Sequence, residues 1–388
     1  MKVAFLSQSD LNLYLFRLSW MKALIREGLQ VYAICPKGDY TNRLKKEGVG
    51  VIHYNIKKNS FNPLNEVKTI YELYKIFKKE NFDILQSFIL KPNIYGAIAG
   101  RLADIPIIIN TVTGLGYVYT VNSSKARLLK LLSKVLYKLS FKIARKVIFQ
   151  NSDDFNDLNG LLDKNKALIM KGTGVDITYF SHKNVDLGRI KAIKDELKIE
   201  NDKLVITMIA RLYWSKGIKE FVEAANMLHK KHRNLVFLII GWIDKGNPDA
   251  ITEGFIKKAT NEFVKFIGKR EDIREILYVT DIYVLPSYRE GMPRTVLEAM
   301  AMEKPIVTTD APGCREAVEN GVNGFLIPIK NSKALAEAIE KLILNKDLRK
   351  KMGRASREKV VKEFSDEVIV HKVLQLYEDI LRDCKMLK

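Results

Sequence analysis

The most constraining feature of this chain is one stretch, residues 286–313, which reads PSYREGMPRTVLEAMAMEKPIVTTDAPG. The apolar run before it, residues 282–285, predicts a buried strand, and residues 295–302 have the apolar spacing of a helix. Pro293 suits the first turn of that helix, and residues 305–309 predict a second strand. Strand, loop, helix and second strand together form the unit that binds phosphate groups in open α/β sheets.

Two carboxylates frame this loop, Glu290 before the predicted helix and Glu298 inside it. We expect Glu290 to face a ligand above the strand end and Glu298 to accept hydrogen bonds from a diol such as a ribose. Backbone amides at the helix start should point at negative charge. The other residues expected to bind the ligand here are Gly291, Met292, Pro293, Arg294, Thr295 and Val296. A solvated structural role fits Glu298 less well, because its neighbours on the helix are largely apolar.

The eight-residue separation of these glutamates resembles the E-x7-E signature of retaining GT-B glycosyltransferases of the large family 4. Arg211 and Lys216, followed by a glycine, resemble the R-x4-K-G element of the same family, and residues 171–176, KGTGVD, resemble its interdomain turn. The resemblance covers nearly the whole chain. It implies an α/β protein of two Rossmann-like, doubly wound parallel-sheet domains that face each other across a cleft.

The periodicity of the chain agrees with that architecture, because buried strands alternate with helices from residue 2 onwards. We place an N-terminal, acceptor-binding domain at residues 1–170 and a nucleotide-sugar-binding domain at residues 171–365. Residues 182–202 are polar and are interpreted as a linker segment of the second domain. Residues 366–388 predict one last amphipathic helix, which the resemblance places against the N-terminal domain.

Two cations follow the strand predicted at residues 204–210, and their spacing suits a diphosphate. An exposed basic loop is the alternative for this element taken alone. The resemblance implies that Arg211 and Lys216 neutralise the β-phosphate of a UDP-sugar while the glycosidic bond breaks. No D-x-D metal motif is present in the sequence, so we expect neither a divalent metal nor another cofactor, with the two cations in place of the ion.

The resemblance assigns further donor contacts. Glu290 would hold hydroxyl groups of the donor sugar and stabilise the oxocarbenium-like centre, and Glu298 would hold the ribose. The nucleotide base would sit near backbone groups around Arg270, and Gly241 would end a strand at the edge of the cleft.

Acceptor contacts are expected from two turns of the N-terminal domain. The first strand-to-helix turn, residues 7–12, lacks the G-x-G-x-x-G of dinucleotide binders and the glycine pair of many GT-B enzymes, so we expect side-chain contacts there from Asn12 and Arg17. The TVTGLGY turn, residues 111–117, allows close backbone approach to a ligand at Thr113, Gly114 and Gly116, although an ordinary loop is the alternative. This turn and the QSFILKPNIYG segment resemble bacterial transferases that act on polyprenyl-diphosphate-linked sugars.

Residues 123–150 contain eight basic side chains and no acidic one. Lys130, Lys134 and Lys138 recur every four residues, which puts a basic stripe on one face of a helix rich in leucine. A basic amphipathic helix of this kind suits docking on anionic lipid. The alternative is a core helix whose outer face is rich in lysine.

The formal net charge of +20, from 65 basic and 45 acidic residues, implies an anionic partner, whether phospholipid, phosphorylated substrate or nucleic acid. No zinc-finger, RRM or KH signature is present in the sequence, which argues against nucleic acid. Three scattered cysteines argue for a reducing compartment. With no secretory leader or run of membrane-spanning length, we expect a cytoplasmic protein, peripheral on the inner face of the cell membrane.

Within the family, the chain is most similar to bacterial N-acetylgalactosaminyltransferases of protein N-glycosylation. That resemblance implies transfer of GalNAc from UDP-GalNAc, in α-1,3 linkage, onto undecaprenyl-diphosphate-linked diacetylbacillosamine. Alternatives within the family are a soluble transferase with a small phosphorylated acceptor and an O-antigen or capsule transferase that uses another UDP-sugar.

Overall fold

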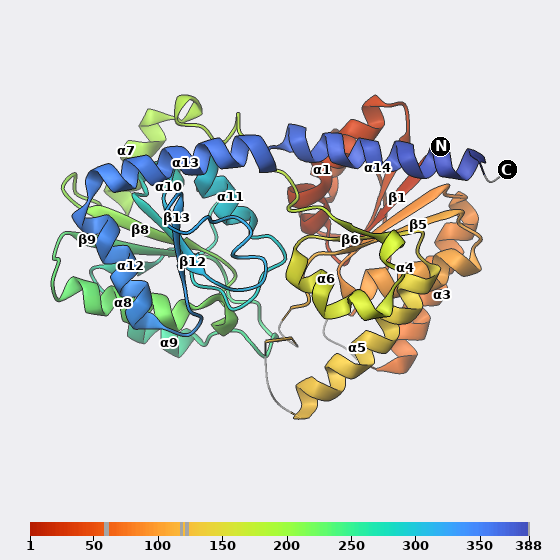
Figure 1. Ribbon diagram of the computed structural model, residues 1–388, viewed down its shortest axis with the longest axis horizontal. Coiled ribbons are helices and arrows are strands. Elements are labelled where there is room, and N and C mark those ends of the chain that lie inside the picture. Colours follow the sequence, from red (N-terminus) through yellow and green to blue (C-terminus); the bar gives the residue numbers. More distant parts are fainter. Residues whose placement is uncertain (58–61, 117–118, 121–123, 387–388) are drawn as a thin grey trace. The chain divides into compact units, whose positions relative to one another are not determined.

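A computed structural model describes residues 1–57, 62–116, 119–120 and 124–386 (Figure 1). The chain divides into two compact units. The N-terminal unit consists of Met1–Gly174 and Asp366–Lys388, and the C-terminal unit is Val175–Ser365. The division therefore falls just after the boundary expected at residue 170, and the last helix belongs to the N-terminal unit.

The N-terminal unit is built on a seven-stranded parallel sheet in the order β3-β2-β1-β4-β5-β6-β7. Its strands are β1 (Lys2–Leu6), β2 (Gln30–Ile34), β3 (Gly50–Ile52), β4 (Ile84–Phe88), β5 (Ile107–Val112), β6 (Lys146–Phe149) and β7 (Ala167–Ile169). Successive side chains point to opposite faces of the sheet. Val3 and Phe5 therefore enter one core, and Ala4 and Leu6 enter another.

Helices cover both faces of this sheet (Figure 1). The face of Val3 and Phe5 is covered by α1 (Asp10–Arg26) and α14 (Asp366–Met386). The opposite face is covered by α3 (Pro63–Glu80), α4 (Leu90–Leu102) and α5 (Ser124–Ile143). Tyr377 of α14 donates a hydrogen bond to Oε1 of Gln86 at 2.7 Å, which ties the last helix to β4.

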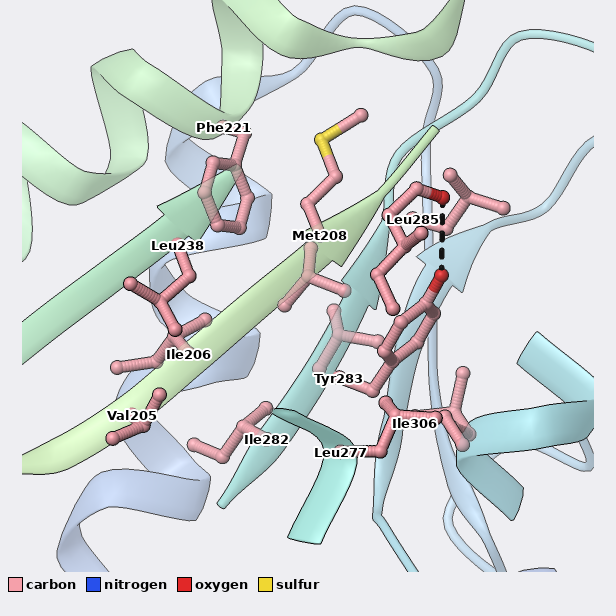
Figure 2. Close-up of a cluster of buried hydrophobic side chains, with 14 of the residues drawn as sticks. Val205, Ile206, Met208, Phe221, Leu238, Leu277, Ile282, Tyr283, Leu285 and Ile306 are labelled. Atoms are coloured by element: carbon pink, nitrogen blue, oxygen red, sulfur yellow. Dashed lines mark hydrogen bonds between the residues drawn. The ribbon is translucent and has the colours of Figure 1, made fainter. Parts of the chain in front are cut away.

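The C-terminal unit is built on a six-stranded parallel sheet in the order β10-β9-β8-β11-β12-β13. Its strands are β8 (Leu204–Ile209), β9 (Leu235–Ile240), β10 (Val264–Phe266), β11 (Ile282–Leu285), β12 (Ile306–Thr309) and β13 (Gly324–Ile327). Its longer helices are α7 (Leu187–Glu196), α8 (Ile218–His229), α11 (Arg294–Ala301), α12 (Ser332–Leu344) and α13 (Lys346–Phe364), and the short ones are α9 (Glu253–Ala259) and α10 (Ile273–Val279). Figure 2 shows part of the core, where Met208 and Tyr283 pack among aliphatic side chains.

The prediction of a linker at residues 182–202 is wrong, because α7 occupies its middle. This helix is mostly polar and buries only Ile190 and Ile193 in its interior, so its apolar signal is weak. Helices α2 (Thr41–Lys46) and α6 (Ser152–Leu158) complete the α-helices and strands of the described residues. Strand β13 and helices α2 and α9 are short, and the sequence analysis did not predict them.

Candidate active site

Two neighbouring strands of the C-terminal unit bring the predicted cations and carboxylates together. Strands β8 and β11 pair in parallel, so the loops that follow them leave the same edge of the sheet. The backbone N–H of Tyr288 donates to the carbonyl oxygen of Ser215 at 2.8 Å, and the hydroxyl of Ser287 donates to the same oxygen at 3.3 Å. The cation loop, residues 210–217, and the carboxylate loop, residues 286–293, are therefore joined directly.

Lys216 and Glu290 form an ion pair across these loops. Their side chains are only 16% and 14% exposed. The turn that carries Lys216, Trp214–Lys216, ends at Gly217 with a φ of 75°. A Cβ at Gly217 would lie 2.1 Å from the carbonyl oxygen of Pro286, so only glycine allows the two loops to approach this closely.

Arg211 contacts a different set of residues from Lys216. Its guanidinium lies 4.7 Å from the ring centroid of Tyr213 and donates to the hydroxyl of that tyrosine at 3.0 Å. Asp244 accepts a hydrogen bond from the same hydroxyl and lies 3.9 Å from Nη1 of Arg211. The sequence predicted the two cations as one set, and in this structure each has its own carboxylate.

Asp249 is a site residue that the sequence did not reveal. It lies in the loop after β9 and is buried. Its carboxylate accepts hydrogen bonds from the hydroxyl and the N–H of Ser215, the latter at 3.3 Å, and its carbonyl oxygen accepts from the N–H of Trp214 at 2.9 Å. Burial raises the pKa of Asp249, and the hydrogen bonds from Ser215 oppose that rise. The only sequence signal was a polar loop after a buried strand.

Helix α11 carries the second predicted glutamate. Nε of Arg294 donates to Oε1 of Glu298 at 3.0 Å. Burial raises the pKa of Glu298, and the charge of Arg294 counters the rise. Pro293 is the N-cap residue and precedes the first turn, so the prediction of Pro293 inside that turn is corrected. Thr295 donates to the carbonyl oxygen of Ile209 at 3.2 Å, which joins the helix start to β8.

The remaining predicted donor residues lie in the carboxylate loop, at the start of α11, and after β9 and β10. Met292 and Val296 are buried in the core, and Gly291 is buried beside them in the loop. The N–H of Gly241 donates to the carbonyl oxygen of Gly268 at 2.9 Å. The side chain of Arg270 is held by Glu196 and Asp272, which raise its pKa further above the usual range. Its guanidinium is thus part of an ion-pair network, and only backbone groups there suit the expected base contact.

In the N-terminal unit, Thr113, Gly114 and Gly116 form the turn after β5. The φ angles of the two glycines are 121° and 71°, which favour glycine. Tyr117, the last residue of the predicted motif, lies outside the described residues. The N–H of Tyr119 donates to the carbonyl oxygen of Gly116 at 3.1 Å, and the Tyr119 hydroxyl lies 3.2 Å from Oγ of Ser133 on α5. The turn is therefore anchored to α5.

Asn12 and Arg17, the other predicted acceptor residues, lie on α1. The side-chain oxygen of Asn12 accepts a hydrogen bond from Ser7 at 3.2 Å, so Asn12 stays beside the first turn. Arg17 is 1% exposed, and its guanidinium packs 4.6 Å from the ring centroid of Trp20 and 4.5 Å from that of Phe88. This packing places Arg17 in the core of the N-terminal unit, and its expected contact with an acceptor stays a prediction.

Helix α5 has an outward face that is mainly apolar. Its exposed large apolar side chains, 42–61% exposed, are Leu128, Leu131, Leu132, Val135, Leu136 and Leu139. Tyr137 and Phe141 point the other way into the core. At about 100° per residue, Lys134, Lys138 and Lys142 follow one edge of the apolar face, and Lys130 lies nearer the core over the ring of Tyr119. The predicted basic stripe therefore borders a leucine surface.

The described residues contain neither a metal-binding cluster nor a membrane-spanning helix. Among them, no three or more His, Cys, Asp or Glu side chains gather where they could hold a metal ion. Within the same residues, no helix is both long and apolar enough to cross a membrane.

Comparison with known proteins identifies the family. The protein-family model "Glycosyl transferases group 1" matches residues 189–359, and the family model "Glycosyl transferase 4-like" matches residues 2–151. A Campylobacter jejuni protein is 35% identical over 384 residues, which are 99% of this chain and 100% of the relative. The chain belongs to the family 4 glycosyltransferases. It is an enzyme that transfers a sugar, and the E-x7-E and R-x4-K-G elements lie in the half matched by the first model.

The names and structures of relatives add detail to this family 4 glycosyltransferase. The Campylobacter jejuni protein is an N,N'-diacetylbacillosaminyl-diphospho-undecaprenol α-1,3-N-acetylgalactosaminyltransferase. An Escherichia coli UDP-Gal:α-D-GlcNAc-diphosphoundecaprenol α-1,3-galactosyltransferase is 30% identical over 82% of this chain and 81% of its own. A glycosyltransferase from Rickettsia africae has a TM-score of 0.79 at 24% identity, covering 98% of both chains. With the two parallel-sheet units, these matches establish the GT-B fold.

Proposed function

We propose that this glycosyltransferase moves a hexosamine, GalNAc from UDP-GalNAc, in α-1,3 linkage onto an undecaprenyl-diphosphate-linked sugar, with diacetylbacillosamine as the acceptor residue. The observation that carries the proposal is the match to the Campylobacter jejuni transferase along 99% of the chain. The Escherichia coli relative supports the acceptor class, because its name also specifies a sugar on diphosphoundecaprenol and an α-1,3 linkage.

The loops after β8 and β11 supply the groups that the donor chemistry needs. Lys216 would neutralise the β-phosphate as the glycosidic bond breaks, and Arg211 would add a second charge when its guanidinium turns from Tyr213 to the diphosphate. Preorganised charge aimed at the transition state is usually the largest single catalytic contribution. In the free enzyme the pairing with Glu290 keeps the ammonium of Lys216 in place before the donor binds.

The two glutamates would bind the other parts of the donor, Glu298 the ribose and Glu290 the transferred sugar. Glu298 accepts one hydrogen bond from Arg294, and a carboxylate with two oxygens has further acceptor sites for the ribose hydroxyls. Glu290 would hold hydroxyls of the sugar beside the carbon at which the bond breaks. The departing phosphate would take the proton of the acceptor hydroxyl on the same face, so the configuration at that carbon is retained.

Helix α5 would hold the enzyme at an anionic membrane, where a polyprenyl-linked acceptor resides. Its outward leucines suit the boundary between headgroups and acyl chains, and the lysines at their edge suit anionic headgroups. Each lysine near an anionic surface contributes about 1 kcal/mol to binding. The contact between Tyr119 and Ser133 supports this arrangement, because it links the acceptor turn to the docking helix.

The proposal is tested by turnover of a UDP-sugar panel that includes UDP-GalNAc, UDP-GlcNAc and UDP-Gal. The acceptor is a polyprenyl-diphosphate-linked diacetylbacillosamine, and released UDP is measured with and without it. Acceptor-dependent release from UDP-GalNAc alone, with an α-1,3 product by NMR, is the expected result. Release from another UDP-sugar would revise the identity of the transferred sugar. If UDP binds but its release does not depend on the acceptor, the proposed acceptor class is wrong.

A further inference from the structure

Helix α3, like α5, has an outward surface of apolar side chains and lysines. Its exposed side chains between residues 64 and 79 are Leu64, Val67, Lys68, Tyr71, Lys75, Lys78 and Lys79. Leu64 is 80% exposed, Val67 64% and Tyr71 55%, values that are high for large apolar side chains. They follow one another at i, i+3 and i+7, so they lie on one face of the helix. Apolar side chains and lysines therefore make up this face.

The carboxylates of α3 have partners outside the helix. Glu66 accepts hydrogen bonds from Lys91 and Tyr95, both of α4. Glu72 accepts two hydrogen bonds from Asn55, at 3.0 and 3.2 Å. Glu80, at the end of the helix, lies 4.0 Å from Nζ of Lys2. Each of the three acidic side chains of α3 is thus paired with a residue outside the helix. Lys78 of the outward face pairs with Asp104 at 2.7 Å, so Lys68, Lys75 and Lys79 give that face its positive charge.

Helices α3 and α5 lie on the same side of the N-terminal unit. Ala4 of β1 is in register with Leu85 and Ile108, and along β5 the same face continues to Val112, which pairs with Phe149. The core against α3 contains the first of these side chains, and the core against α5 contains the last. Figure 1 shows α3, α4 and α5 on one side of the sheet and α1 and α14 on the other.

Helices α3 and α5 also begin at the same edge of the sheet. Each helix follows one parallel strand and precedes another, so both begin at the carboxyl edge and run back from it. Leu64, Val67 and Tyr71 occupy the first half of α3, and the exposed apolar side chains of α5 run from Leu128, in its second turn, to Leu139. The acceptor turn at Thr113–Gly116 follows β5 at this edge as well.

We propose that the outward face of α3 is a second membrane contact, which inserts Leu64, Val67 and Tyr71 among the headgroups of an anionic bilayer while Lys68 and Lys75 pair with lipid phosphates. The proposal rests on the docking role proposed for α5. Two membrane contacts would fix the tilt of the N-terminal unit on the membrane. With α5 alone in contact, the N-terminal unit could rotate about the axis of that helix. A fixed tilt holds the acceptor turn at a constant height above the lipid.

The test measures co-flotation with vesicles of phosphatidylcholine and phosphatidylglycerol at a ratio of two to one. The variants are Leu64→Ser/Val67→Ser/Tyr71→Ser on α3 and Leu131→Ser/Leu132→Ser/Val135→Ser on α5. Leu187→Ser/Leu344→Ser is the matched control, because both leucines are exposed and lie in the C-terminal unit. We expect the α3 variant to lose at least about tenfold in vesicle partition, the α5 variant more, and the control less than twofold.

A second measurement reports the contact directly. Val67→Cys is labelled with an environment-sensitive dye in a chain carrying Cys384→Ser, since Cys35 and Cys314 are buried. The dye emission should shift to the blue on vesicle addition, and the same label at Leu187→Cys should not shift. An α3 variant that partitions like the wild type, with an unshifted dye, overturns the α3 contact alone. Failure of the wild type to bind vesicles overturns the docking role of α5 as well, while UDP release with a water-soluble acceptor analogue tests the transferase activity separately.

Discussion

Lys216 and Glu290 meet at the carboxyl edge of the C-terminal sheet, although 74 positions separate them in the chain. The pair is mostly shielded from water, so its attraction is screened less than that of a surface pair. A cation held here in advance needs little reorganisation when a diphosphate arrives. This pairing therefore predicts that turnover depends strongly on Lys216.

Replacing Lys216 with alanine should lower kcat by about 10²- to 10³-fold, because the charge that stabilises the leaving diphosphate is lost. The KM for the UDP-sugar should change less. Arg211→Ala should act in the same direction. Steady-state UDP release measures both, with Lys219→Ala as the matched control, since that lysine is 60% exposed on the next helix. Unchanged turnover in both Lys216→Ala and Arg211→Ala would remove the diphosphate assignment.

Replacing Glu298 with alanine should mainly weaken nucleotide binding. Hydrogen bonds to a charged group contribute about 1.5–3 kcal/mol, so the Kd for UDP should rise about 10- to 100-fold. The loss also leaves Arg294 without the acceptor it has in α11. Calorimetric titration with UDP checks the prediction, and UMP provides a comparison that lacks the β-phosphate. An equal affinity of the variant and the wild type would place the ribose elsewhere.

Activity should be independent of divalent metal, because Lys216 and Arg211 supply the positive charge on the diphosphate. We expect full UDP release after treatment with EDTA and no gain on adding Mg²⁺ or Mn²⁺. In the same assay, added Mg²⁺ should partly restore the activity of Lys216→Ala, because the metal ion can replace part of the missing positive charge. Loss of wild-type activity in EDTA, with recovery on Mg²⁺, would contradict the prediction.

The sequence predicted the strands better than the contacts between loops. Residues 282–285 formed a continuous apolar run and are β11, because a strand covered on both faces must be apolar throughout. The same pattern could not reveal Asp249, whose partner Ser215 lies 34 positions away on another loop. Nor could it orient α5, since leucines and aromatic residues are both common on a buried helix face. Packing of Tyr137 and Phe141 into the core decides that the leucines face outward.

His182 should make the stability of the C-terminal unit depend on pH. Burial, with the nearby charge of Lys304, lowers its pKa below the usual value near 6.5. The unfolded chain therefore binds this proton at a higher pH than the folded chain does. The free energy of unfolding should fall as the pH drops from about 6.5 toward the lowered pKa, and this contribution is fully present above that window.

Chemical denaturation at a series of pH values measures the effect of His182. The variant His182→Gln should show a flatter pH dependence below about pH 6.5. It can still donate to the carbonyl oxygen of Met302, which lies 2.9 Å from Nε2 of the histidine. His371→Gln is the control, because that side chain is exposed. Identical slopes for wild type and His182→Gln would assign the pH dependence to other groups.

Asp249 should act through Lys216, since its carboxylate holds the Ser215 turn from which the lysine projects. Asp249→Asn keeps the size of the side chain but weakens this hold, and we expect kcat to fall about tenfold with a small change in the KM for the donor. Asp202→Asn, at an exposed position, is the control. Coupling distinguishes this role from a general loss of stability. In a Lys216→Ala background, Asp249→Asn should cost little more, because the group that it positions is already gone. Fully additive effects on kcat would show that Asp249 acts independently of Lys216.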